Sequence, residues 1–582
     1  MRSLKNLTVL QAAFLLIILA CWPLFHPEFF RVHDYTHVAR LVEMVDALQV
    51  GHFPVHWSAN FGYGYGMPLF LFYGPLPYYL ASIPALIGFS ALNSIKLLIV
   101  FTHFTAWTGM YFLLKKWGRT PAFIGASAFL FAPYRAVDLY VRGAFNELLA
   151  MSFLPWILYF SWQVVKKPKR GWLGVSLLSA GLVLTHNLTA LISLPILFCL
   201  GAVGLWLTNH SWRPILILIS SFVMGAALSL FYALPALVEK DLTIIESITS
   251  GYFDFKLHFL YIRQFWQENW GYGGSSFGPH DDISFHFGWL TLGLTILAGW
   301  QIIKKISLSW HEKNTWQFDR TKNKLLLLTL ISGGFLGISL YMSIFKSQWL
   351  WEMIPLLAYI QFPWRFLAVA NFLAAMLAGW SIWFIRPRLR RWLLAWLVVI
   401  LLVLTQMRWH QPEKYLDNHQ TFYYEDRQLI REKMSDILLD YLPLTFDRNL
   451  PPVEPENRIV LDGQSTKVDW QINEPHRLLF KTTGTKNTKI IWNIADFPGW
   501  KYYIDYQEVQ PQLLGDGRRY LVTEKDFESV GAIFTATPIR QQTQVVSLLA
   551  GLIWLAVALP PFFSLADFKL IKFNQKKRTK EK

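Results

Sequence analysis

Three residues that could carry acid–base or metal chemistry follow the first apolar segment of the chain. His33, Asp34 and His37 lie in the stretch EFFRVHDYTHVARL. Ionisable side chains beside a membrane are costly to desolvate, so they usually mark a functional site. A carboxylate next to a histidine can act as a general base or as a metal ligand. Asp34 also precedes a helix predicted to end near Val50, so helix capping is the structural alternative.

A second group of charges lies in the stretch FAPYRAVDLYVRGAFNELLAM. Its charged residues are Arg135, Asp138, Arg142 and Glu147. We expect a short outer loop here, residues 134–147, with Glu147 at the start of the next membrane span. An arginine beside a carboxylate forms either a structural ion pair or part of a phosphate site. The stretch alone does not separate these two interpretations.

Three further stretches place polar groups at predicted span ends. His186 and Asn187 interrupt an apolar run in LTHNLTAL, where His186 is either a turn residue or a ligand. Trp364 and Arg365 occur in AYIQFPWRFLAV, where the arginine either extends into water or binds a lipid phosphate. The stretch RQFWQENWGYGGSSFGPHDDISFHFGWL combines aromatic and acidic residues. Its rings serve either as sugar platforms or as interfacial belt residues.

The overall composition places these groups in a membrane protein. The chain has 582 residues, 53% of them hydrophobic, with 27 tryptophans, which is too apolar for a soluble protein of this length. The net charge of +16 comes from short Lys and Arg clusters between apolar runs, so we expect no nucleic-acid partner. Cys21 and Cys199 both lie in apolar runs, which excludes a disulfide framework and a cysteine-based zinc site.

The apolar runs predict a polytopic α-helical membrane protein with about twelve spans, because one span needs about 20 apolar residues. The spans are expected to begin near Thr8, Ser94, Pro121, Leu148, Trp172, Thr189, Pro214, Gly288, Leu325, Phe366, Trp392 and Thr543. The basic clusters between them should face the cytoplasm, which places both chain termini there and the acidic and histidine groups outside. The first segment is interpreted as an uncleaved anchor.

Residues 68–90 form an apolar run that contains four prolines. Each proline removes a helical hydrogen bond, so we predict a re-entrant or interfacial element, with a broken spanning helix as the alternative.

The remaining non-membrane sequence divides the chain into four parts. Residues 1–407 form the transmembrane domain with its outer loops, and residues 408–456 form an outer linker with a helical pattern. Residues 457–542 alternate apolar and polar residues between turn signals, which predicts an extracytoplasmic β-sandwich-like domain. Residues 543–582 form the last span and a basic cytoplasmic tail.

Seven short stretches in a fixed order carry a resemblance to known proteins. They are HDYTHV, YGPLPYYL, DLYVRGAFNE, THNLTAL, QFPWRFLAVANF, DYLP and DFPGWKYYIDYQE. The chain resembles a bacterial family of multi-pass membrane proteins labelled 6-pyruvoyl-tetrahydropterin synthase-related and, more distantly, YfhO-like members of the GT-C glycosyltransferase superfamily. The histidine cluster with which soluble pterin synthases hold zinc is not found in this sequence.

The GT-C resemblance implies an enzyme that moves a sugar from a polyprenyl-phosphate donor to an envelope glycan or lipid-linked acceptor. It implies that Asp34, with His33 beside it, is the acidic residue of the first outer loop and that Glu147 is that of the second. The chemistry of the side chains makes Arg142 and Arg365 candidates for the carrier phosphate. His186 and Trp364 are further substrate-binding candidates.

The resemblance also implies a divalent cation as a candidate cofactor, with Asp34, His33 and Glu147 as its ligands. The first loop lacks an Asp-x-Asp pair, so metal dependence stays open. Two other functions fit the same sequence: a transporter for a lipid-linked glycan, and a non-catalytic envelope assembly protein. Transporters are often built from repeated halves, and no repeat is seen in the sequence.

Overall fold

The computed structural model describes residues 2–208, 211–244, 249–313, 324–382, 388–417, 425–437, 439–462 and 469–559. The predicted basic tail at residues 569–582 lies outside these ranges, as do Arg386 and the middle of the basic cluster at 304–324.

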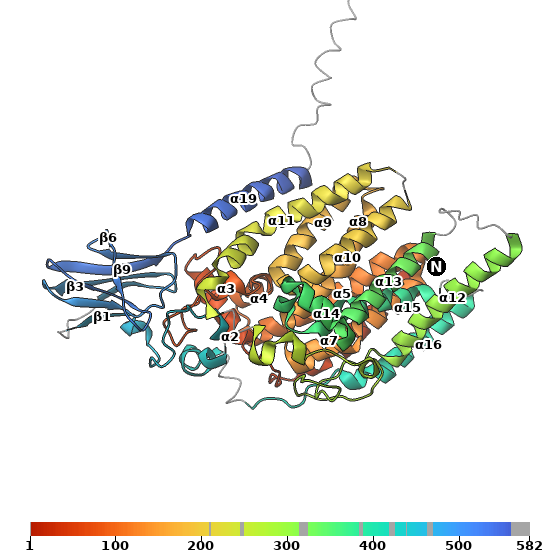
Figure 1. Ribbon diagram of the computed structural model, residues 1–582, viewed down its shortest axis with the longest axis horizontal. Coiled ribbons are helices and arrows are strands. Elements are labelled where there is room, and N and C mark those ends of the chain that lie inside the picture. The colour runs from red at the N-terminus through yellow and green to blue at the C-terminus, as the bar shows by residue number, and fades with distance from the viewer. Residues whose placement is uncertain are drawn as a thin grey trace, which may run out of the picture.

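Each predicted span corresponds to a helix in the described part of the chain (Figure 1). These are α1 (Arg2–Ala20), α5 (Ala91–Leu114), α6 (Arg119–Leu130), α8 (Phe145–Gln163), α9 (Pro168–Thr185), α10 (Asn187–Trp206), α11 (Arg213–Glu239), α12 (Trp289–Lys313), α13 (Lys324–Ser343), α15 (Leu367–Ser381), α16 (Arg388–Gln406) and α19 (Pro538–Ala558). The helix that begins at Arg119 reaches the length of a span only together with the helical turns that continue it to Arg142. Seven helical segments of the described chain are long and apolar enough to cross a membrane. The number twelve therefore stays a prediction.

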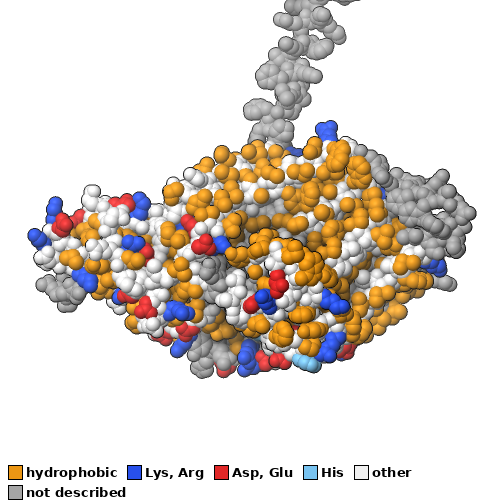
Figure 2. Space-filling view, in the orientation of Figure 1, with side chains coloured by type: hydrophobic (Ala, Val, Ile, Leu, Met, Phe, Trp, Pro, Cys, Tyr) orange, Lys and Arg blue, Asp and Glu red, His pale blue; other side chains and the backbone are white. Residues whose placement is uncertain are grey.

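The helices form one bundle, and hydrophobic side chains cover much of the face seen in Figure 2. Small residues let neighbouring helices approach closely, as is common in membrane bundles. A Cβ atom on Gly379 of α15 would lie 2.7 Å from the backbone carbonyl of Pro121 on α6, so this contact requires glycine. The bundle is thus held by close backbone packing as well as by its apolar core.

Residues 68–90 contain two short helices, α3 (Leu69–Phe72) and α4 (Leu76–Leu86). At about 1.5 Å per residue, the 11 residues of α4 are too short to cross a hydrocarbon layer about 30 Å thick. This length agrees with the prediction that the segment does not span.

The predicted outer loop at residues 134–147 is not a loop. It consists of the short helix α7 (Pro133–Val137) and a π-helical turn (Asp138–Arg142) that leads into α8. Asp138 and Glu147 are almost completely buried. Arg142 forms ion pairs with both Asp138 and Glu147 in the interior. Arg135 is buried without a hydrogen-bond partner in the described structure, and its guanidinium lies 5.0 Å from the ring centroid of Phe129.

The C-terminal region contains the predicted antiparallel β-structure, arranged in two sheets. One sheet has the order β1-β4-β8-β7 and the other the order β2-β3-β9-β5-β6. The strands are β1 (Ile459–Asp462), β2 (Asp469–Asn473), β3 (Arg477–Gly484), β4 (Lys489–Trp492), β5 (Trp500–Ile504), β6 (Gln507–Val509), β7 (Gln512–Leu513), β8 (Arg519–Val522) and β9 (Phe527–Phe534). Trp492 of β4 connects the sheets, because its Nε1 donates to the carbonyl of Gly531 on β9 at 3.3 Å.

The β-region packs on the segment that follows α2 (His37–Gln49). The ring of Trp57 contacts Trp500 and Phe534 at centroid distances of 5.3 and 5.0 Å. The rings of His52 and His476 stack at 4.3 Å. The linker between bundle and β-region contains α18 (Arg427–Leu429), and Arg427 forms an ion pair with Asp46 of α2. A further short helix, α14 (Gln348–Met353), lies between α13 and α15.

Candidate active site between the first outer segment and helix α8

Two predicted site segments, distant in sequence, are joined through their backbones. The N–H of His33 donates to the carbonyl of Val141 at 3.0 Å, and the N–H of Asp34 donates to the carbonyl of Arg142 at 2.9 Å. Gly143 then turns the chain with a φ of +67°, and a Cβ on it would lie 2.8 Å from the carbonyl oxygen of Asp34. The two predicted acidic groups therefore belong to one structural unit.

The Asp34 carboxylate lies in a cage of donors and stays partly accessible. Oδ2 accepts from Arg40 at 2.9 Å and from Tyr73 at 3.3 Å, and the Nε2 of His37 lies 3.4 Å away. Oδ1 accepts from the Thr36 hydroxyl at 2.8 Å. The Asp34 side chain keeps 32% of its exposure.

Charge keeps this carboxylate ionised. Burial alone would raise the pKa of Asp34, but the positive charge of Arg40, together with His37, outweighs it and holds the pKa well below its ordinary value. Asp34 is not a helix cap, which corrects that alternative. The N-cap residue of α2 is Thr36, and the Asp34 side chain bonds the Thr36 hydroxyl rather than a free N–H of the helix.

Glu147 lies in the first turn of α8 and is only 1% exposed. Its Oε1 accepts from Tyr134 at 2.6 Å and its Oε2 accepts from Arg142 at 2.8 Å. Arg142 also contacts Asp138, and its guanidinium lies 4.5 Å from the ring centroid of Trp364. Arg142, the predicted phosphate-binding residue of this segment, is thus in direct contact with Glu147, its predicted acidic residue.

Arg365 joins the same cluster from the turn that precedes α15. Its Nε lies 3.7 Å from Oε2 of Glu147, and its NH1 donates to the Ile360 carbonyl and to Gln361. Arg365 is 9% exposed, so the alternative that it extends freely into water is wrong. The neighbouring Trp364 donates from Nε1 to Ser275 at 3.2 Å, which fixes its ring against Arg142.

His186 is the N-cap residue of α10. Its Nδ1 accepts from the backbone N–H of Thr189 at 3.3 Å. The chain turns here beside α8, because Asn146 donates to the carbonyl of Thr185 at 3.0 Å. His186 is therefore a turn residue, which is one of the two alternatives predicted from the sequence. The turn lies beside Asn146, the residue before Glu147.

The three predicted metal ligands do not converge in the described structure. The Nε2 of His33 bonds the carbonyl of Tyr272 at 2.8 Å, Asp34 faces Arg40, and Glu147 faces Arg142. In the described part of the chain, no group of three or more His, Cys, Asp or Glu side chains is placed to hold a metal ion. The donor set of the described residues does not fit a divalent cation in this arrangement.

The aromatic stretch after α11 packs beside the site. Asp281 accepts from Gln264 and from the N–H of Ser276, at 2.6 and 2.7 Å, and so holds its own turn together. Glu268 forms an exposed ion pair with Arg408. These contacts favour a structural use for both carboxylates.

Sequence reasoning missed three residues that shape the surroundings of Asp34. Arg40 is 2% exposed, and its guanidinium lies 4.1 Å from the ring centroid of Tyr73. Tyr78 bonds Nδ1 of His37 at 2.8 Å. Arg40 in the helical stretch HVARLVEMV was the one available signal, because an arginine on a helix that becomes buried requires a carboxylate partner. The tyrosines carried no such signal.

Comparisons with known proteins identify the family and give weaker structural likenesses. The model of a membrane-protein family described as "6-pyruvoyl-tetrahydropterin synthase related domain" matches residues 70–411. An uncharacterised protein of Lactococcus lactis subsp. cremoris is 24% identical over 310 residues, which cover 51% of this chain and 45% of that protein. The chain thus spans less than half of the curated relative that it matches.

Three solved structures are similar over much of the chain. The oligosaccharyltransferase of Archaeoglobus fulgidus matches with a TM-score of 0.39 and 14% identity over 77% of this chain and 61% of that one. The mycobacterial arabinofuranosyltransferase AftD matches with 0.38 and 14% over 69% and 26%. ArnT of Cupriavidus metallidurans, bound to undecaprenyl phosphate, matches with 0.35 and 12% over 69% and 63%. Since the family model covers more than half of its length, the chain belongs to the 6-pyruvoyl-tetrahydropterin synthase-related family of membrane proteins.

Proposed function

We propose that this protein is a GT-C type glycosyltransferase that moves a sugar from a polyprenyl-phosphate donor to an extracytoplasmic glycan or lipid-linked acceptor. The observation that carries the proposal is the backbone connection of Asp34 to Arg142. It joins the backbone of a residue with a partly exposed carboxylate to that of an arginine in a charged cluster, and it supports the proposal because glycosyl transfer from a phosphate needs both kinds of group.

In the proposed reaction, the acceptor hydroxyl donates a hydrogen bond to Oδ1 of Asp34. Its oxygen attacks the anomeric carbon of the donor sugar, and the bond from that carbon to the phosphate oxygen breaks. The phosphate leaves with the bonding electron pair, and Asp34 takes the hydroxyl proton as the new bond forms. Because Asp34 is a weak base in its cage, its proton uptake belongs to a late stage of bond formation.

Arg142 and Arg365 are assigned to the departing phosphate, since guanidinium groups offer several donors in a fixed plane. Glu147 is assigned a positioning role, because both of its oxygens already hold Tyr134 and Arg142. Trp364 and His186 would line the substrate side of the cluster. His33, whose Nε2 bonds the carbonyl of Tyr272, would fix the adjacent aromatic segment.

The wider architecture is part of the same proposal. About twelve spans would carry the site on the outer face, with both termini in the cytoplasm and the β-sandwich-like domain outside. Residues 408–456 would hold that domain beside the first outer segment, where it could cover the site or bind the acceptor. The contacts of Trp57 and His52 with the β-region support this placement.

The test compares cells that make the intact protein with cells that make equally abundant Asp34→Asn protein. Mass spectrometry of polyprenyl-linked and surface glycans should show one sugar missing from the acceptor and its donor accumulating. Loss of a general base typically lowers a rate by about 10²–10⁴-fold. Asp241→Asn is the matched control, because Asp241 is an exposed carboxylate with 70% side-chain exposure.

Unchanged glycans in the Asp34→Asn cells, together with an altered envelope in cells lacking the protein, would refute the catalytic role. That result would favour the transport or assembly functions instead.

A further inference from the structure

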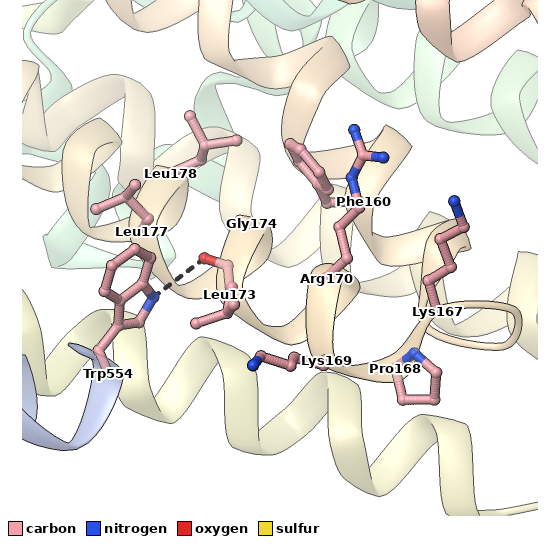
Figure 3. A pocket seen from close by; sticks show the side chains of 10 residues that line it. All are labelled: Phe160, Lys167, Pro168, Lys169, Arg170, Leu173, Gly174, Leu177, Leu178 and Trp554. Atoms are coloured by element: carbon pink, nitrogen blue, oxygen red, sulfur yellow. Dashed lines mark hydrogen bonds between the residues drawn. The ribbon is translucent and has the colours of Figure 1, made fainter. Parts of the chain in front are cut away.

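A groove of about 580 Å³ lies between α8, α9 and α19 (Figure 3). It is at the start of α9, whereas the other end of that helix, at Thr185, contacts Asn146 beside Glu147. The 18 residues of α9 extend over about 27 Å, close to the thickness of a hydrocarbon layer. The groove and the candidate active site therefore lie at opposite ends of α9.

The body of the groove is apolar. A Cβ on Gly174 would lie 2.3 Å from the ring of Phe160, so glycine allows α8 and α9 to pack closely at its base. Trp554 of α19 forms the opposite wall, and its Nε1 donates to Ser176 at 3.1 Å and to the Leu173 carbonyl at 3.2 Å. Leu177 is 51% exposed toward this space. Such a surface suits hydrocarbon chains rather than a water-soluble ligand.

The mouth of the groove is positively charged. Lys167, Lys169 and Arg170 line it at the N-terminal end of α9, and all three are exposed. None of them forms an ion pair within the described residues, and the first turn of α9 contains no acidic residue. Helix N-termini favour anions, and a basic pocket between spans is typical of a lipid phosphate site.

We propose that this groove binds one anionic phospholipid, with its phosphate at Lys169 and Arg170 and its acyl chains along Leu177 and Trp554. The bound lipid would connect α9 to the end of α19, where the Nζ of Lys169 lies 3.4 Å from the Leu559 carbonyl. The start of α19 is already fixed by the buried ion pair of Arg540 with Glu239, at 2.8 Å. This inference does not depend on the proposed glycosyl transfer.

The test uses native mass spectrometry of the full chain in detergent, titrated with phosphatidylglycerol or with phosphatidylcholine of the same acyl chains. The natural sequence should bind one phosphatidylglycerol about tenfold more tightly than phosphatidylcholine. Lys169→Gln with Arg170→Gln should remove that preference. Lys115→Gln with Arg119→Gln removes two cations outside the groove and should leave it unchanged. Leu177→Trp should weaken both lipids by about tenfold, because the ring fills the groove.

Equal binding of the two lipids by the natural sequence would overturn the proposal. So would an equal loss of preference in the two double variants, which would indicate a general surface charge effect. Displacement of phosphatidylglycerol by millimolar inorganic phosphate would indicate a free phosphate site instead. Unchanged size-exclusion profiles would show that the variants, whose substituted side chains lie at the surface, remain folded.

Discussion

The backbone N–H of Asp34 donates a 2.9 Å hydrogen bond to the carbonyl of Arg142, one residue before Gly143 turns the chain. This connection fixes the exposed carboxylate relative to the arginine cluster. The Nε2 of His37 adds a contact of 2.6 Å with the Gly143 carbonyl. A displacement of this turn would move both halves of the proposed site.

Gly143→Ala should therefore abolish activity and lower the thermal midpoint. The substitution adds strain at a φ of +67° and places Cβ 2.6 Å from a methyl group of Val32 and 2.8 Å from the Asp34 carbonyl. Gly51→Ala is the control, since Gly51 has a φ of +75° and open space around a Cβ. It should cost only the strain, about 1–2 kcal/mol. Equal effects of the two variants in a thermal melt and a transfer assay would contradict the prediction.

Arg40→Met should shift the acid limb of the pH–rate profile to higher pH. The positive charge of Arg40 holds the pKa of Asp34 well below its ordinary value, against the opposing effect of burial. With Arg40 present, the pKa of Asp34 is lower in the folded state than its unfolded value near 3.9. The carboxylate therefore contributes its full stability above pH 3.9, and this contribution is lost as pH falls through the folded pKa. Removing the cation raises that folded pKa. Transfer rates measured from pH 4 to 8 test this shift, and parallel profiles would refute it.

The sequence predicts the helices better than the site that they build. Pro168, Pro214 and Pro538 lie in the first turns of α9, α11 and α19, and proline is favoured there because its missing N–H has no helical partner. The predicted start at Pro214 lies one residue from the observed start of α11, whereas the predicted starts at Trp172 and Thr543 lie four and five residues inside α9 and α19. In the β-region, β3 alternates buried and exposed residues as its apolar pattern indicates.

The site contacts could not be predicted because they connect residues far apart in sequence. His37 bonds Gly143, 106 residues away, and Arg142 lies over the ring of Trp364. Residues 134–147 are predicted as a short outer loop with either an ion pair or a phosphate site, yet Glu147 is buried because Tyr134, Arg142 and Arg365 complete its contacts. Charge in a sequence therefore indicates where polar partners are needed, not whether they come from water.

Glu147→Gln should destabilise the fold strongly. The substitution leaves Arg142 and Arg365 without the carboxylate that both face, and breaking a buried ion pair typically costs about 3–5 kcal/mol. Glu268→Gln is the contrast, because Glu268 and Arg408 form a pair of half-exposed side chains and such pairs stabilise little. Thermal melts in detergent should show a large fall in midpoint for the first variant alone. Equal falls in the thermal midpoint of the two variants would show that the buried ion pair stabilises the fold no more than the half-exposed one.

Acidification should weaken the contact between the β-region and the segment that follows α2, where the rings of His52 and His476 stack. Burial, with the neighbouring His476 and His56, lowers the pKa of His52 to about 3, below the unfolded value near 6.5. The folded state thus requires a neutral ring, so its stability is complete above pH 6.5 and declines as pH falls toward 3. At pH 5 the loss from this one group is about 2 kcal/mol. His52→Phe keeps a ring to stack on His476 without the titration and should reduce, by the share of this one group, the fall in thermal midpoint between pH 7.5 and 5. His280→Gln changes an exposed histidine and should leave that fall as it is. An unaltered pH dependence in His52→Phe would exclude His52 as its source.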